Sequence, residues 1–341
     1  MTDTETALPC AAGIQHLAAA LWPNADGPRR IAVVGASKNA GKTTAMLAIA
    51  AAARVRGWQV GLLTIGVDGE QRDAWLDFAK PRVTCEQGAW VVTAWPWIAQ
   101  AGQKLADATD LGFGSALGPT GIARIRTRCA VQLGGIAHRG QLRRAVQALA
   151  ARADVVIVDG AYHRQAAAHP DIADAVVVAV GALAGSTGAQ AIAASMPTLR
   201  ALAARPAASG DRTPVVAAAG ALTDALVADH PDAGTFRTRD ASRVLLSAAG
   251  WQALDRMGAQ AVVESAIPLA VIVSNPFRPD SQGEDARWFC GALADAARGV
   301  GAPIVDVVAG LRAGPLQELA TGPERNTIAC AAPRAGGNAD A

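Results

Sequence analysis

The stretch IAVVGASKNAGKTT, residues 31–44, joins a short apolar run, a glycine-containing loop and the start of an alanine-rich segment. The β-branched run at 31–34 is typical of a buried parallel strand. Residues 44–55 have high helix propensity, and Gly57 is a suitable residue to end that helix. Strand, loop and helix therefore follow one another in the order that a phosphate-binding loop requires.

Residues 36–43 match the looser form of the P-loop pattern, in which alanine replaces the leading glycine. Small residues allow successive backbone N–H groups to surround an anion, and the helix N-terminus adds a partial positive charge. We expect Lys42 to reach the β- and γ-phosphates of a nucleotide and the Thr43 hydroxyl to bind Mg²⁺. A chance match in a chain rich in Gly and Ala is the alternative, and the flanking strand and helix patterns argue against it. The residues expected to contact the nucleotide are Ser37, Lys38, Asn39, Ala40, Gly41, Lys42, Thr43 and Thr44.

Two acidic residues follow strand patterns, where a nucleotide site needs carboxylates. Asp159 directly follows the apolar run at 155–158, and Asp68 comes after the strand pattern that succeeds the loop helix. Because parallel strands end at the same sheet edge, both are expected beside the loop. Asp159 is interpreted as the Walker B-type carboxylate on the Mg²⁺ side, and Asp68 as a group that holds Mg²⁺ through water or polarises a nucleophile. The alternatives are an ordinary strand end for Asp159 and an Asp-Gly turn for Asp68.

Several further polar residues are weaker candidates. Lys80, which precedes a proline, either contacts a phosphate or an acidic substrate group or is a surface lysine. His138 lies in a glycine-rich turn that enters a helix, and it is a candidate general base only with a carboxylate beside it. Tyr-His-Arg at 162–164 either faces the γ-phosphate or belongs to a solvated loop.

The composition indicates a globular protein. Of 341 residues, 51% are hydrophobic and 18% are charged, which is typical of a folded chain. The net charge of +2 provides no strong basic field for nucleic acid, and the alternating arginines at 124–128 are more typical of the wet face of a strand. Five scattered cysteines without metal-ligand spacing favour a reduced, cytoplasmic setting. The N-terminus has no signal-peptide pattern and no apolar run has membrane-spanning length, so no membrane association is expected.

Alternating strand and helix patterns predict an α/β fold with a doubly wound, mostly parallel sheet of the P-loop NTPase type. Residues 82–136 interrupt this alternation and are interpreted as an antiparallel insertion or sheet extension. The chain is therefore divided into an N-terminal leader or cap at 1–29, an α/β domain at 30–313 and a tail at 314–341 that is expected to be disordered. Strands are expected at 31–34, 59–64, 155–158, 175–180, 214–218, 269–273 and 303–308, and helices at 11–21, 43–56, 139–152, 187–204, 241–256 and 284–298.

Seven segments match a known family in order and spacing, although each is weak alone. They are KNAGKTT (38–44), LLTIGVDGE (62–70), KPRVTCEQGAWVVTA (80–94), VVIVDGA (155–161), GALTD (220–224), RDASRVLL (239–246) and SNPFRPD (274–280). Together they resemble the P-loop subunit of the lysine 5,6-aminomutase reactivase family over nearly the full chain. A more distant likeness extends to dethiobiotin synthetase and to the P-loop proteins of molybdopterin-guanine-dinucleotide synthesis.

The resemblance implies an ATP-dependent accessory protein that serves an adenosylcobalamin- and pyridoxal-phosphate-dependent aminomutase and helps to replace inactivated cobalamin. It also implies that Lys42, Thr43 and Asp159 bind the nucleotide and Mg²⁺. The chain departs from the family pattern in Ala36, in its alanine-rich leader and in GGIAHRGQ at 134–141, where a more polar turn is expected.

Three functions follow from these observations. The first is a Mg²⁺-dependent ATPase that remodels a cobalamin-dependent aminomutase, with the mutase or a second reactivase subunit as its partner. The second is a small-molecule synthetase or kinase of the dethiobiotin-synthetase type, in which ATP activates a carboxylate or carbamate. The third is a nucleotide-gated binding module, acting as a homodimer without turnover. ATP is favoured over GTP because no Asn-Lys-x-Asp guanine-reading motif occurs.

Overall fold

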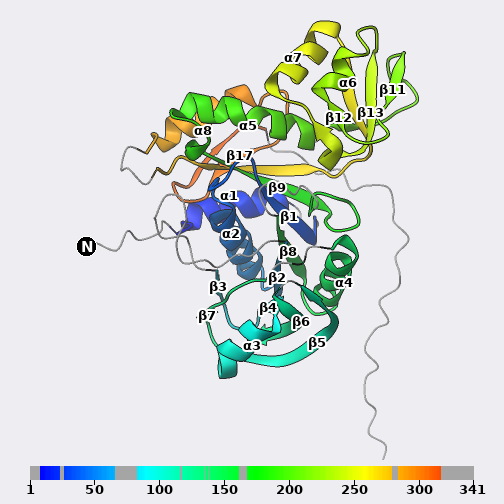
Figure 1. Cartoon of the computed structure of the whole chain (residues 1–341). Coiled ribbons are helices and arrows are strands. Elements are labelled where there is room, and N and C mark those ends of the chain that lie inside the picture. The colour runs from blue at the N-terminus through cyan, green and yellow to red at the C-terminus, as the bar shows by residue number, and fades with distance from the viewer. Residues whose placement is uncertain are drawn as a thin grey trace, which may run out of the picture.

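The computed structural model describes residues 8–23, 27–65, 83–115, 117–134, 136, 138–160, 167–278 and 283–315. At its centre is a ten-stranded sheet (Figure 1). The strands from β17 to β4 are parallel, whereas β18, β6 and β5 are antiparallel to their neighbours. The predicted α/β class with a large, mostly parallel sheet is therefore confirmed. Across the sheet the order is β18 (Leu311–Ala313), β17 (Ile304–Asp306), β16 (Leu269–Asn275), β9 (Ala175–Gly181), β1 (Arg30–Gly35), β8 (Val155–Asp159), β2 (Val60–Thr64), β4 (Trp90–Ala94), β6 (Gly118–Ile125) and β5 (Leu105–Ser115).

Helices cover both faces of this sheet, which explains why the central strands are apolar along their whole length. Every residue of β8 and β9 is buried, as is every residue of β1 after Arg30. No helix within the described ranges combines the length and the apolarity needed to span a bilayer. One face packs against α1 (Ala11–Leu21) and α2 (Lys42–Val55), and the other against α4 (Arg139–Ala150), α5 (Gly188–Leu202) and α8 (Ala286–Ala296).

The N-terminal helix α1 has the predicted bounds, but it packs more deeply than a peripheral cap. Leu17, Leu21 and Trp22 are fully buried in the core on the α2 side of the sheet. The backbone N–H of Cys10 donates to the carbonyl oxygen of Val307 at 2.9 Å. Helix α1 is therefore part of the main core.

The segment predicted as an insertion at 82–136 extends the sheet at one end. Its first long strand, β4, pairs in parallel with β2, and only β6 and β5 then continue the sheet in antiparallel fashion. The interpretation of this segment as a sheet extension is confirmed. Its remaining elements are α3 (Trp95–Ala101), the 3₁₀ turn η1 (Gly102–Lys104) and a ribbon of β3 (Thr84–Cys85) with β7 (Cys129–Ala130).

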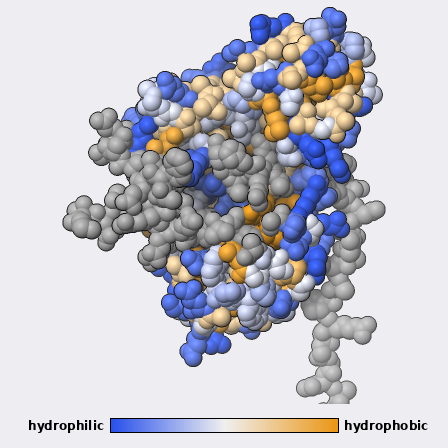
Figure 2. All heavy atoms as spheres, in the orientation of Figure 1, coloured by the Kyte–Doolittle hydropathy of each residue, from blue (hydrophilic) through white to orange (hydrophobic). Residues whose placement is uncertain are grey.

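A second lobe with its own core lies between α5 and β16 in the sequence. Its buried centre includes Phe236, Trp251 and Leu254. The strand predicted at 214–218 forms, but in the four-stranded sheet of this lobe and not in the central sheet. Figure 2 shows hydrophobic and hydrophilic atoms interspersed on this lobe, at the top of the view. Its elements are β10 (Arg205–Pro206), β11 (Val215–Ala217), β12 (Leu222–Thr223), α6 (Asp224–Ala228), β13 (Thr235–Asp240), η4 (Ala241–Arg243), β14 (Val244–Leu245), α7 (Ala248–Met257) and β15 (Gln260–Ser265).

The helix predicted over 241–256 is wrong in its first turns, because α7 begins only at Ala248. The Asp240 carboxylate accepts a hydrogen bond from the Ser242 backbone N–H at 3.0 Å and forms a short turn. Ser247 then caps α7, and Gly258 ends it with a φ of 61°. Local hydrogen bonds from Asp and Ser side chains compete with helix formation, so the apolar pattern alone placed the start too early.

Asp174 joins the beginnings of β1 and β9. It accepts hydrogen bonds from the backbone N–H of Arg30 at 2.9 Å and from the Arg30 side chain at 2.5 and 3.1 Å. Burial by itself would raise the pKa of Asp174, but the Arg30 hydrogen bonds and charge outweigh it and hold the pKa below the ordinary 3.8.

We expect Asp174→Asn to lower the free energy of unfolding by about 1.5–3 kcal/mol near neutral pH, because charge-assisted hydrogen bonds are lost. A lowered carboxyl pKa contributes stability that is present above the unfolded-state value and is lost as the pH falls through the folded-state value. The difference between wild type and variant should therefore shrink below pH 3.8. Urea unfolding at several pH values measures it. Asp255→Asn, in an exposed pair with Arg200, is the control and should cost less than about 1 kcal/mol; equal losses in both variants would contradict the prediction.

Candidate functional site

The loop at 36–41 emerges from the middle of the central sheet, at its carboxyl edge. Strand β1 lies between β9 and β8, and all three are parallel. Helix α2 leaves β1 towards one face of the sheet, while α5, which follows β9, covers the other face (Figure 1). In open α/β sheets, ligands bind where neighbouring connections leave in opposite directions.

The backbone of the loop presents consecutive N–H groups. Asn39 and Gly41 have positive φ angles of 59° and 98°, which asparagine and glycine tolerate best. Helix α2 then begins without a side-chain cap. Within the described residues, none of the backbone N–H groups of 39–44 donates to a protein acceptor. This run of donors at the positive end of a helix suits an anion such as phosphate.

Lys42 folds back over the beginning of the loop. A Cβ placed on Gly35 would lie 3.1 Å from Cγ and 3.2 Å from Cδ of Lys42, so the glycine leaves room for the lysine stem. Of the other predicted loop residues, Ser37 and Ala40 are buried and Lys38 is exposed, while Thr43 and Thr44 are half-buried in the first turn of α2. The predicted nucleotide residues therefore occupy one continuous cradle.

Two residues that support the loop were not predicted as site residues. A Cβ on Gly181, at the end of β9, would lie 2.7 Å from the Cα of Ala40, and one on Gly41 would lie 2.8 Å from Nδ2 of Asn275, at the end of β16. The loop thus rests against two neighbouring strand ends. Asn275 lies within the segment at 274–280 that carries part of the resemblance, whereas no sequence signal distinguishes Gly181 from other strand-end glycines.

Asp159 lies at the same edge, on the other side of β1. It is 2% exposed and is in register with Val33 on β1. Its Oδ2 accepts a hydrogen bond from the Thr64 hydroxyl at 3.4 Å, at the end of β2. The structure therefore brings Asp159 to the strand adjoining the loop, as predicted. Asp68 lies outside the described residues.

The oxygen donors at this edge fit Mg²⁺. Thr43 provides a hydroxyl in the first turn of α2, and Asp159 provides a carboxylate. Among the described residues, no group of three or more His, Cys, Asp or Glu is placed to hold a metal ion. Mg²⁺ usually takes one or two protein oxygens together with substrate phosphates, so this pair would hold the ion only with a nucleotide in the cradle.

At the start of the neighbouring helix α5, protein side chains accept hydrogen bonds from the backbone N–H groups of Gly188 and Gln190. The Gly188 N–H donates to Oε1 of Glu284 at 2.6 Å. Arg278 donates to the carbonyl oxygens of Ala182 and Gly185, each at 2.8 Å, in and beside the 3₁₀ turn η3 (Ala182–Ala184). Among the described residues, no side chain accepts in this way at the start of α2.

Of the weaker sequence candidates, His138 lies among the residues that the structure describes. His138 precedes α4 and is exposed, and no described carboxylate pairs with it. Arg124 and Arg128 form ion pairs with Asp107 at 2.7 Å and Glu86 at 2.9 Å, in agreement with a structural role on a wet strand. Lys80 and the tripeptide at 162–164 lie outside the described residues.

Comparison of the chain with family models, with curated proteins and with solved structures gives no match in any of the three. The interpretation of the site therefore depends on its sequence and its geometry.

Proposed function

We propose that this protein binds Mg²⁺–ATP in the loop at 36–43, as a nucleotide-binding protein of the P-loop type. The observation that carries the proposal is the run of backbone N–H groups at 39–44, which have no acceptor among the residues that the structure describes, with the Lys42 stem against Gly35 at the beginning of the loop. A polyphosphate provides acceptors for all these donors at once, and its charge complements both the helix N-terminus and the lysine.

We further propose that the site hydrolyses ATP. Bound Mg²⁺ would neutralise charge on the phosphate oxygens. The loop N–H groups and Lys42 would position the γ-phosphate and stabilise the charge that develops on it. Thr43 and the buried Asp159 would orient the metal side, and Asp68 would act on the nucleophile. Lys42, Asp159 and Asp68 are therefore the proposed catalytic residues.

Asp159→Asn tests the metal side of the site. We expect Mg²⁺-dependent phosphate release to fall about a hundredfold, because the amide cannot stabilise the cation as the carboxylate does. Affinity for ATP without Mg²⁺ should change little, since the phosphate cradle remains intact. Phosphate release across a Mg²⁺ series and calorimetric titration of ATP in EDTA measure the two effects.

Asp154→Asn is the matched control, because Asp154 lies next to β8 at its opposite end and accepts a hydrogen bond from the Gln59 N–H at 2.7 Å. It should leave Mg²⁺ dependence unchanged. Normal Mg²⁺-dependent hydrolysis by Asp159→Asn would remove this residue from the site.

We also propose that hydrolysis is coupled to a protein partner, an adenosylcobalamin-dependent aminomutase or a second reactivase subunit, in the cytoplasm. The resemblance of the seven segments supports this step, and the four free cysteines among the described residues agree with a reducing compartment. ATPase assays with and without an inactivated mutase test it, with stimulation and recovered mutase activity as the expected result. Turnover with a small metabolite alone would favour a synthetase or kinase, and binding without turnover would favour a homodimeric nucleotide-gated module.

A further inference from the structure

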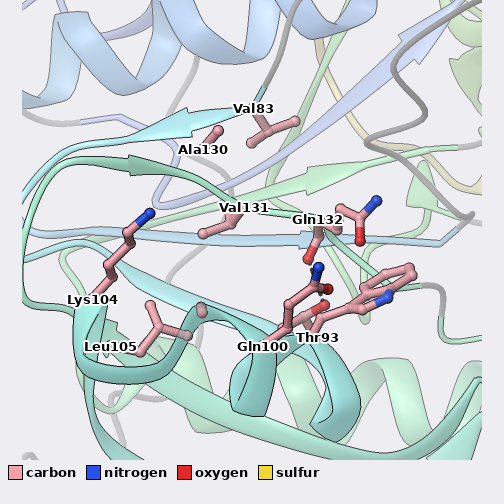
Figure 3. A pocket seen from close by; sticks show the side chains of 10 residues that line it. Val83, Thr93, Gln100, Lys104, Leu105, Ala130, Val131 and Gln132 are labelled. Carbon is pink, nitrogen blue, oxygen red and sulfur yellow. Dashed lines mark hydrogen bonds between the residues drawn. The ribbon is translucent and has the colours of Figure 1, made fainter.

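A separate hollow of about 270 Å³ lies between α3 and the β3–β7 ribbon (Figure 3). It opens beside β4, which is separated from β1 by β2 and β8. At about 4.8 Å between strands, β4 lies about 14 Å from β1. A small ligand confined to this hollow would therefore not touch phosphates in the loop at 36–43.

Two structural elements form the walls. Trp97, Gln100, Ala101 and Lys104 follow one another at helical spacing, so they share one face of α3 and η1. The opposite wall is the ribbon, where the Val131 N–H donates to the Val83 carbonyl oxygen at 2.9 Å. The hollow is thus enclosed by regular elements on two sides.

The interior is apolar in its middle and polar at its ends. Leu105 and Val131 are 8% and 9% exposed and line the hollow. Figure 3 shows Lys104 at one end, and Gln100 and Gln132 well away from it at the other. The side chains of these three polar residues have no hydrogen-bond or ion-pair partner among the residues that the structure describes. All three residues are exposed, so their polar groups lie at the open rim of the hollow and face solvent.

The described residues of the lining carry charge of one sign. No acidic side chain is among them, and Lys104 is the one cation that they include. Lysine is scarce among the 31 basic residues of the chain, and Lys104 is the one lysine of the described part outside the phosphate loop. An ammonium is a compact point charge that pairs with a carboxylate without the planar geometry of arginine.

We propose that this hollow binds a small amphipathic carboxylate. Its carboxylate would pair with Lys104, its short apolar chain would contact Leu105 and Val131, and a hydroxyl or amide group at its far end would bond to Gln100 and Gln132. This assignment is independent of the proposed nucleotide site.

The test uses the full chain without nucleotide and two probes, 6-hydroxyhexanoate and its uncharged counterpart 1,6-hexanediol. Ligand-observed saturation-transfer NMR should detect the acid with a Kd of about 1 mM, as expected for a ligand of about nine non-hydrogen atoms. The diol should bind at least about tenfold more weakly, because it lacks the charge-assisted contact.

Lys104→Gln should weaken the acid about tenfold and leave the diol unchanged. Ala130→Phe should displace both probes by filling the hollow from the exposed ribbon. Arg298→Gln, which removes an 81% exposed cation on another helix end, is the control and should change nothing. Equal binding of the two probes, unchanged binding of the acid by Lys104→Gln, or no saturation transfer at about 10 mM acid would each overturn the proposal. None of these outcomes bears on ATP binding.

Discussion

Lys42→Ala is expected to reduce ATP hydrolysis by about a hundredfold or more while the fold is retained. The lysine stem lies over Gly35, within the cradle formed by the loop N–H groups. Removal of a preorganised positive group from developing phosphate charge has effects of this size. Steady-state phosphate release measures the change, and far-UV circular dichroism with a thermal melt checks the fold. If the wild-type protein binds ATP without turnover, the expected loss is in nucleotide affinity.

Arg54→Ala is the matched control for Lys42→Ala, because Arg54 is an exposed cation near the other end of α2. It should hydrolyse ATP at the wild-type rate. Lys42→Arg should also be impaired, since a planar guanidinium does not replace the compact point charge of the ammonium. Normal hydrolysis by Lys42→Ala would show that the loop has been assigned the wrong role.

Gly181→Ala should weaken ATP binding about ten- to a hundredfold, although the residue is not expected to touch the nucleotide. Its φ of −116° is accessible to alanine, so the backbone conformation does not require glycine. The new Cβ, however, would lie 2.7 Å from the Cα of Ala40, and the loop must move to accommodate it. Displacements of about 1 Å in a binding site can cost a hundredfold in rate, and an affinity loss of similar order is expected here. Titration with Mg²⁺–ATP measures the loss.

Gly299→Ala is the control for this packing effect, because an added Cβ there meets no atom within 4 Å. It should bind ATP as the wild type does. Gly181→Ala with unchanged affinity would mean that the loop is flexible enough to rearrange at no cost, and that β9 does not position it.

Local patterns predicted much of the main body correctly. The helix expected at 11–21 is α1, and the helices expected at 43–56 and 139–152 differ from α2 and α4 by one or two residues at their ends. Asp159 was placed at the end of a buried strand from four apolar residues alone. These features depend on hydrophobic periodicity and on capping residues, which are properties of short segments.

Arrangements between distant segments were not predictable in this way. The apolar pattern at 214–218 identified a strand but not the sheet that it joins. An apolar run does not specify its partner strand, and β11 lies half-exposed at the edge of the smaller sheet. The turn made by Asp240 and the cap made by Ser247 shortened a helix whose apolar pattern continued through them. Side-chain hydrogen bonds to the backbone prevailed over periodicity there.

The sequence by itself determined that a strand, a small-residue loop with Lys42 and a helix follow one another, because each of these is a local preference of the chain. It also determined that Asp159 ends a strand. Only the tertiary structure decided that β9, β1 and β8 are neighbours, and that Gly181 and Asn275 support the loop from positions far along the chain. The physical reason is that the closest approaches in a packed core are set by which elements meet, and the residues that permit them carry no local signature.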